Sequence, residues 1–82
     1  MFINKNDGRN NICGVNIAKV RAEMKISQRE LADKLQLFGL DMDKNAIQRI
    51  EAGKRFVTDI ELVGFHKVLG MSFEDLLSHN KL

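Results

Sequence analysis

The feature that most restricts how this chain can fold is a regular series of helix start and stop signals. Residues able to cap a helix N-terminus recur after the first third of the chain: Ser27, Asp43, Thr58 and Ser72. Glycines close three of the intervening stretches: Gly39, Gly53 and Gly70. A capping side-chain oxygen accepts a hydrogen bond from a free N–H of the first helical turn, and glycine tolerates the left-handed backbone that ends a helix. Since the chain has no proline, these signals set the helix boundaries.

Apolar residues recur between the signals at the three- and four-residue intervals of amphipathic helices. Two of the starts are capping boxes, formed by Ser27 with Glu30 and by Thr58 with Glu61. The expected inward side chains are Ile17, Val20, Met24, Leu31, Ala32, Leu35, Ile47, Ile50, Leu62, Phe65 and Leu69. A short fifth helix holds Phe73, Leu76 and Leu77. No stretch alternates with the period of a β-strand, so the sequence predicts one compact all-α domain of five short helices over residues 12–82.

Residues 1–11 are expected to form a flexible N-terminal arm. They are rich in turn and coil formers: Asn4, Asn6, Asp7, Gly8, Asn10 and Asn11. Lys5 and Arg9 give the arm positive charge, with which it would follow the backbone of a nucleic acid or enter one of its grooves.

The remaining composition excludes several classes of protein. Cys13 is the only cysteine, so we expect an inert apolar side chain and no intrachain disulfide. Together with His66 and His79 it gives no metal-ligand spacing, and we expect no metal and no cofactor. No nucleophile–base spacing indicates an enzyme. No apolar run approaches the roughly 18–20 residues of a membrane span and no signal peptide is evident, so we expect a cytoplasmic protein without membrane contact.

Positive charge is concentrated around the third expected helix, residues 44–52. The net charge of the chain is only +2, yet residues 44–55 carry four cations and one anion. Ile47 and Ile50 form the apolar side of this helix, and its other side presents Lys44, Asn45, Gln48 and Arg49. Cationic and amide side chains match the hydrogen-bonding groups on base edges in the DNA major groove, which admits an α-helix. The pattern favours a nucleic-acid partner; a solvated helix face is the alternative.

Four sequence segments of the chain follow one another in an order and at distances that also occur in a known protein family. They span residues 17–21, 26–32, 45–55 and 69–77, with Ser-Gln-Arg-Glu-Leu-Ala in the second and Ile-Gln-Arg-Ile-Glu-Ala-Gly in the third. In this order and at these distances they strongly resemble the Cro/phage-repressor-like (XRE) helix-turn-helix family, over residues 17–77. The resemblance implies a lambda repressor-like fold and a double-stranded DNA operator as the partner.

The resemblance also implies roles for individual residues. The positions that read bases in this family are held here by Lys44, Asn45 and Arg49, with Gln48 beside them. Phosphate contacts are implied for Gln28, Lys54 and Arg55, and Gln28 should also brace the recognition helix. Arg21 and Glu51 match a buried or half-buried ion pair that joins the first helix to the third.

The sequence departs from the family pattern at two places. The connector 36–43 is longer than the usual tight turn and is apolar, and we expect it to extend the preceding helix and to pack Phe38 or Leu40 into the core. If exposed, it would be a surface for a protein partner. His66 stands where the family usually has alanine, and we expect a hydrogen-bonded or partly exposed structural histidine rather than a pH switch.

The resulting expectation is a small transcriptional regulator, a repressor, that binds DNA of specific sequence. One domain makes few base contacts, so we expect a homodimer on an inverted repeat, with the final helix and Leu82 as the dimer surface. No small-molecule ligand is evident. The alternative is a protein-interaction module, such as an antitoxin or an anti-repressor partner, that uses the connector 37–42 and the C-terminal helix.

Overall fold

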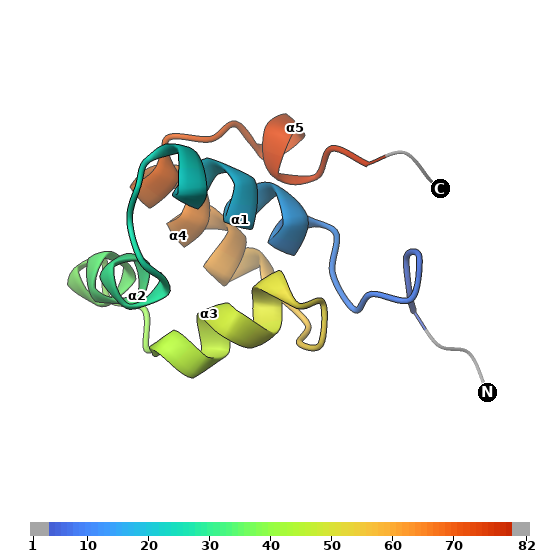
Figure 1. Ribbon diagram of the computed structural model, residues 1–82, viewed down its shortest axis with the longest axis horizontal. Coiled ribbons are helices and arrows are strands. Elements are labelled where there is room, and N and C mark those ends of the chain that lie inside the picture. Colours follow the sequence, from blue (N-terminus) through green and yellow to red (C-terminus); the bar gives the residue numbers. More distant parts are fainter. Residues whose placement is uncertain (1–3, 80–82) are drawn as a thin grey trace.

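The computed structural model describes residues 4–79 and consists of five α-helices (Figure 1). They are α1 (Cys13–Glu23), α2 (Gln28–Leu37), α3 (Lys44–Glu51), α4 (Asp59–Leu69) and α5 (Phe73–Leu76). Helix α3 packs against α1 and α2, while α4 contacts α1, α2 and α5. No β-strand occurs within residues 4–79. The predicted all-α, five-helix architecture is therefore confirmed.

All four predicted helix starts are N-caps in the structure. At each one a side-chain oxygen accepts a hydrogen bond from the backbone N–H three residues later: Ser27, Asp43, Thr58 and Ser72. Both capping boxes are complete. Ser27 Oγ accepts from the Glu30 N–H at 3.0 Å, and Glu30 Oε1 accepts from the Ser27 N–H at 2.9 Å. Because these signals are local, the chain alone predicts where the helices begin.

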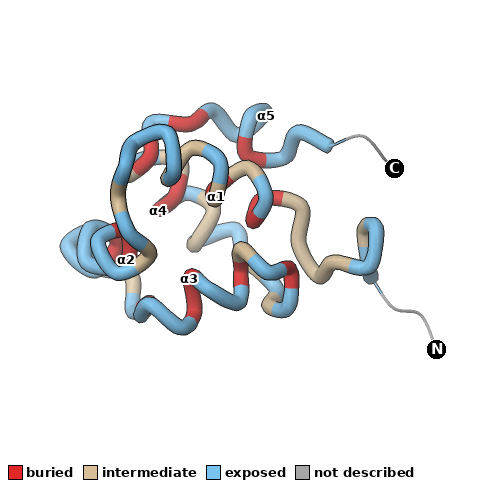
Figure 2. Tube along the Cα trace, in the orientation of Figure 1, coloured by how far each residue is buried: buried red, intermediate tan, exposed pale blue. Residues whose placement is uncertain are grey.

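The core lies where the five helices meet, and every helix contributes to it (Figure 2). Its fully buried side chains include Ile17, Leu31, Leu35, Ile47, Ile50, Phe65 and Leu76. Met24, which was expected to point inward, is 42% exposed. It lies just after the end of α1, where fewer neighbouring helices are available to cover it. Phe73, at the start of α5, is 44% exposed, and Leu77, just after the end of α5, is 42% exposed.

The apolar connector between α2 and α3 is divided between core and solvent. Leu40 packs against the core and lies against Gly64 of α4, and Met42 is buried. Leu37 is 91% exposed and Phe38 52% exposed. The expectation that Phe38 or Leu40 enters the core is met by Leu40. Helix α2 extends to Leu37, as expected for this connector.

His66 and Cys13 are both structural residues. The Nδ1–H of His66 donates a hydrogen bond to the Met71 carbonyl, and its ring stacks on Phe73 with 4.2 Å between ring centroids. His66 is also partly exposed, so both features expected of it are present. Cys13 is buried, and burial raises the pKa of its thiol to about 11, so the thiol stays protonated and unreactive at neutral pH.

Candidate nucleic-acid interface

Helix α3 has one buried side and one side that faces solvent. Ala46, Ile47 and Ile50 are buried against the core. The exposed side carries Lys44, Asn45, Gln48 and Arg49. Within residues 4–79, none of these four side chains makes a hydrogen bond or an ion pair. The helix lies along one edge of the molecule (Figure 1), and buried and exposed residues alternate along it (Figure 2). The four side chains are therefore accessible to a partner.

A hydrogen-bonded cluster centred on Glu51 holds α3 to α1 and α2. Arg21 Nε donates to Glu51 Oε2 at 2.7 Å, and Arg21 Nη2 donates to Glu51 Oε1 at 3.0 Å. Gln28 Nε2, at the start of α2, donates to the same Oε1 at 3.0 Å. The Arg21 and Glu51 side chains are 20% and 9% exposed, and hydrogen bonding to Glu51 raises the pKa of Arg21. Arg21 and Gln28 thus both contact the Glu51 carboxylate, while the roles that the resemblance implies for these residues stay predictions.

The loop after α3 carries Lys54 and Arg55, which differ in their surroundings. Lys54 is exposed. The Arg55 guanidinium instead turns to α4, where Nη2 donates to Glu61 Oε2 at 2.9 Å and Nη1 donates to Glu61 Oε1 at 3.0 Å. This ion pair was not predicted from the sequence, in which Glu61 was expected only as the capping partner of Thr58. Arg55 therefore fixes the loop to the N-terminus of α4.

Replacing Glu61 by glutamine tests this loop pair through its pH dependence. The Arg55 guanidinium holds the pKa of Glu61 below its ordinary value of 4.5. The stability contributed by the pair is therefore complete above that pH and is lost as the pH falls through the lower pKa of the folded state. We expect Glu61→Gln to lower the free energy of unfolding by about 1 kcal/mol at neutral pH, where a partly exposed ion pair is lost.

Urea unfolding of both proteins at a series of pH values checks this prediction. The glutamine Oε1 can still accept from the Thr58 N–H, so the capping box is retained. The difference between the two proteins should shrink as the solution is made acidic. Glu23→Gln, which removes an exposed carboxylate from the end of α1, is the control. A difference for Glu61→Gln that stays constant into strong acid would contradict the ion pair.

The segment before α1 is tied to the end of α3. Residues 6–9 form a tight turn in which the Asn6 and Arg9 backbones exchange hydrogen bonds of 2.9 and 3.0 Å, with positive φ at Asp7 and Gly8. Arg9 Nη2 then donates to the Glu51 carbonyl at 2.6 Å. Residues 9–11, assigned from the sequence to a flexible arm, are thus anchored on the domain. The partners are about forty positions apart in the chain, so no local pattern identified them.

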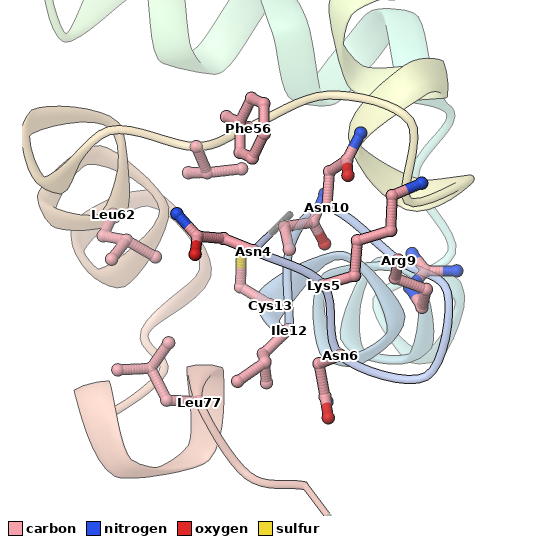
Figure 3. A pocket seen from close by; sticks show the side chains of 12 residues that line it. Asn4, Lys5, Asn6, Arg9, Asn10, Ile12, Cys13, Phe56, Leu62 and Leu77 are labelled. Atoms are coloured by element: carbon pink, nitrogen blue, oxygen red, sulfur yellow. The ribbon is translucent and has the colours of Figure 1, made fainter. Parts of the chain in front are cut away.

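The same segment forms one wall of a cavity of about 470 Å³ (Figure 3). Leu62 and Leu77 line it on one side, and Asn4, Lys5 and Arg9 on the other.

Among residues 4–79, no group of three or more histidine, cysteine, aspartate or glutamate side chains could hold a metal ion. No helix in this part of the chain is long and apolar enough to cross a bilayer.

Comparison with known proteins matches a region that includes α2 and α3. A helix-turn-helix family model, of the Cro/C1 type, matches residues 17–76, from the middle of α1 to the end of α5. Comparison with curated proteins and with solved structures finds no match. The five-helix arrangement is the lambda repressor-like fold of that family, in which α2 and α3 form the DNA-binding helix-turn-helix. With most of its length matched, the chain belongs to the Cro/C1-type helix-turn-helix (XRE) family.

Proposed function

We propose that the protein is a transcriptional repressor that binds double-stranded DNA of specific sequence with α3 in the major groove. The observation that carries the proposal is the division of α3 into two sides. Ala46, Ile47 and Ile50 hold the helix on the core, while cationic and amide side chains without internal partners face outward. A helix presented in this way fits the major groove, where base edges offer complementary donors and acceptors.

The residues around α3 divide into two proposed roles. Base reading is assigned to Lys44, Asn45, Gln48 and Arg49. Phosphate contacts, which set the orientation of the helix on the duplex, are assigned to Gln28, Lys54 and Arg55. Gln28 lies at the N-terminus of α2, where free backbone N–H groups also favour an anion. Arg55 is held by Glu61, so its part in phosphate binding is secondary to its part in fixing the loop.

A homodimer on an inverted repeat is the proposed binding form. Two α3 helices about 34 Å apart would enter successive major grooves on one side of the duplex. The final helix can supply only part of the dimer surface, because Leu76 is fully buried in the core. Phe73 and Leu77 are half exposed and remain candidates, and Leu82 lies outside the described residues.

Selection of binding sites from a random duplex pool, followed by sequencing, tests the proposal directly. We expect an enriched inverted repeat whose half-sites are one helical turn apart. Enrichment of a single half-site would support specific DNA binding but contradict the dimer. Absence of any enriched sequence, in a pool that the protein retains at low ionic strength, would contradict base reading by α3.

Two alanine variants should separate base reading from phosphate contact. We expect Arg49→Ala to weaken binding to the selected site and to relax the base preference at one position by about 1–3 kcal/mol. Lys54→Ala should instead weaken binding to all sequences alike and make the slope of log affinity against log salt shallower by about 0.9. Fluorescence anisotropy with matched and single-base-substituted duplexes measures both effects. Identical behaviour of the two variants would contradict the assigned roles.

The exposed connector supports the alternative role as a protein-interaction module. Leu37 and Phe38 present apolar side chains to solvent at the end of α2. Phe38→Ala is therefore the matched control in the DNA measurements. It should leave duplex affinity unchanged if α3 is the binding surface. If a partner protein instead binds through Phe38, this variant should lose binding to that partner, and the affinity for the partner should depend only weakly on salt.

A further inference from the structure

The end of the recognition helix α3 and the loop that follows it are hydrogen-bonded to the N-terminal segment. Carbonyl oxygens accept hydrogen bonds from residues 9–11 at five positions: Ile50, Glu51, Gly53, Lys54 and Arg55. The shortest of these bonds runs from Arg9 Nη2 to Glu51 at 2.6 Å, and the bonds from Asn11 Nδ2 to Arg55 and from the Asn10 N–H to Gly53 are both 2.8 Å. We call residues 9–11 the clasp.

The clasp fits the chemistry of a helix C-terminus. The last carbonyls of a helix have no partner within it, and they carry partial negative charge that favours a cation. Arg9 supplies that cation, and its Nη2 also donates to the Ile50 carbonyl at 3.3 Å. Gly53 permits this approach, because a Cβ added there would lie 2.7 Å from the Arg9 Cζ. The clasp therefore replaces solvent at the end of α3.

Asn11 connects this end of α3 to the start of α1. Its Oδ1 accepts from the Gly14 N–H at 2.9 Å, while its Nδ2 donates to the Ile50 carbonyl at 3.0 Å. One amide thus sets the distance between α1 and the end of α3. Beyond that point the clasp holds the loop that carries Lys54, through the backbone N–H of Asn10 on the Gly53 carbonyl at 2.8 Å.

Burial of the Arg9 side chain includes a contribution that opposes folding. Its Nε is buried and has no hydrogen-bond partner among the described residues. A buried donor without a partner opposes folding, which offsets part of what the two Nη2 bonds contribute. Removal of the side chain should then change the position of the loop more than the stability of the domain.

We propose that Arg9 and Asn11 are positioning residues for DNA binding, which fix the end of α3 and the Lys54 loop in the geometry that contacts a phosphate. This inference rests on the proposed binding of DNA. It assigns a role to residues that lie before the family-matched region 17–76.

The test measures affinity of the full chain for a mixed-sequence DNA duplex, by anisotropy, well below the unfolding temperature. We expect Arg9→Ala to weaken binding about tenfold and to make the salt slope shallower by about 0.9, the effect of losing one phosphate contact. Arg9→Lys keeps the charge but lacks the planar guanidinium, whose Nη2 donates to both the Ile50 and the Glu51 carbonyl, and should weaken binding similarly. Lys19→Ala removes an exposed cation from α1, to which no DNA contact is assigned, and is the control, with affinity near that of the original chain.

A double-mutant cycle separates positioning from direct contact. In a Lys54→Ala background, Arg9→Ala should cause little further loss of affinity, because the two changes remove the same phosphate contact. Full additivity of the two changes, or full affinity of Arg9→Lys, would overturn the proposal in favour of a direct charge contact by Arg9. Unchanged affinity of Arg9→Ala would also overturn it. Failure of the original chain to bind any duplex would instead contradict the proposed function. Should Arg9→Ala not fold, the Arg9→Lys comparison decides.

Discussion

Replacement of Arg21 by alanine is expected to lower the free energy of unfolding by about 3 kcal/mol, a large part of the stability of so small a domain. Glu51 has a side chain that is only 9% exposed, and among residues 4–79 Arg21 is its one charged partner, through two hydrogen bonds. Without the guanidinium a nearly buried carboxylate would keep only the neutral amide of Gln28. The variant also loses the bond from Arg21 Nη1 to the Ile26 carbonyl.

Chemical denaturation at neutral pH measures this loss. Lys19→Ala, at an exposed position of the same helix, is the matched control and should change stability by less than about 0.5 kcal/mol. The double variant Arg21→Ala with Glu51→Ala should be less destabilised than the sum of the single variants, because it leaves no unpaired charge. If Arg21→Ala unfolds with the stability of the Lys19→Ala control, the pair does not hold α1 to α3.

The sequence predicts the parts of this fold that depend on neighbours within a few positions. Ser27 and Thr58 accept from residues three positions ahead, and the stripe of Ile47 and Ile50 sets which side of α3 faces the core. Because the stripe defines the inner side of the helix, it also predicts that Gln48 and Arg49 face solvent. The family resemblance adds the Arg21–Glu51 pair, which spans thirty positions and has no local signal.

The remaining contacts could not be predicted, because they depend on how distant segments meet. Arg9 is one of two cations in a segment rich in asparagine, and only the folded chain places it against the Glu51 carbonyl. The segment also precedes the region that the family shares. Glu61 already had a capping role, which concealed its ion pair with Arg55. Leu76 appeared to offer an apolar outer surface, but a helix of one turn gives too little periodicity to tell its buried side from its exposed one.

Gly14→Ala is expected to destabilise the domain by about 2–3 kcal/mol, although alanine is the better helix former by about 1 kcal/mol. Gly14 is buried in the first turn of α1, where an added Cβ would meet the backbone carbonyl oxygen of Ile50. It would also approach Asn11 Oδ1 to 2.7 Å and Arg9 Nη2 to 2.9 Å. A backbone oxygen at the end of α3 cannot rotate away, so α1 and α3 must separate and the clasp must open.

Gly64→Ala distinguishes this obstruction from a general intolerance of larger residues at helix contacts. The Cβ added at Gly64 would meet a methyl group at the end of the Leu40 side chain, which can adopt another rotamer within the connector. The gain in helix propensity then offsets most of the strain, and we expect a change within about 1 kcal/mol. For a domain of this size, thermal unfolding should separate the two variants by roughly 5–15 °C, with Gly14→Ala the less stable. Equal unfolding temperatures would mean that the end of α3 is not held close to α1, and the geometry through which Arg9 and Asn11 position the Lys54 loop would fail with it.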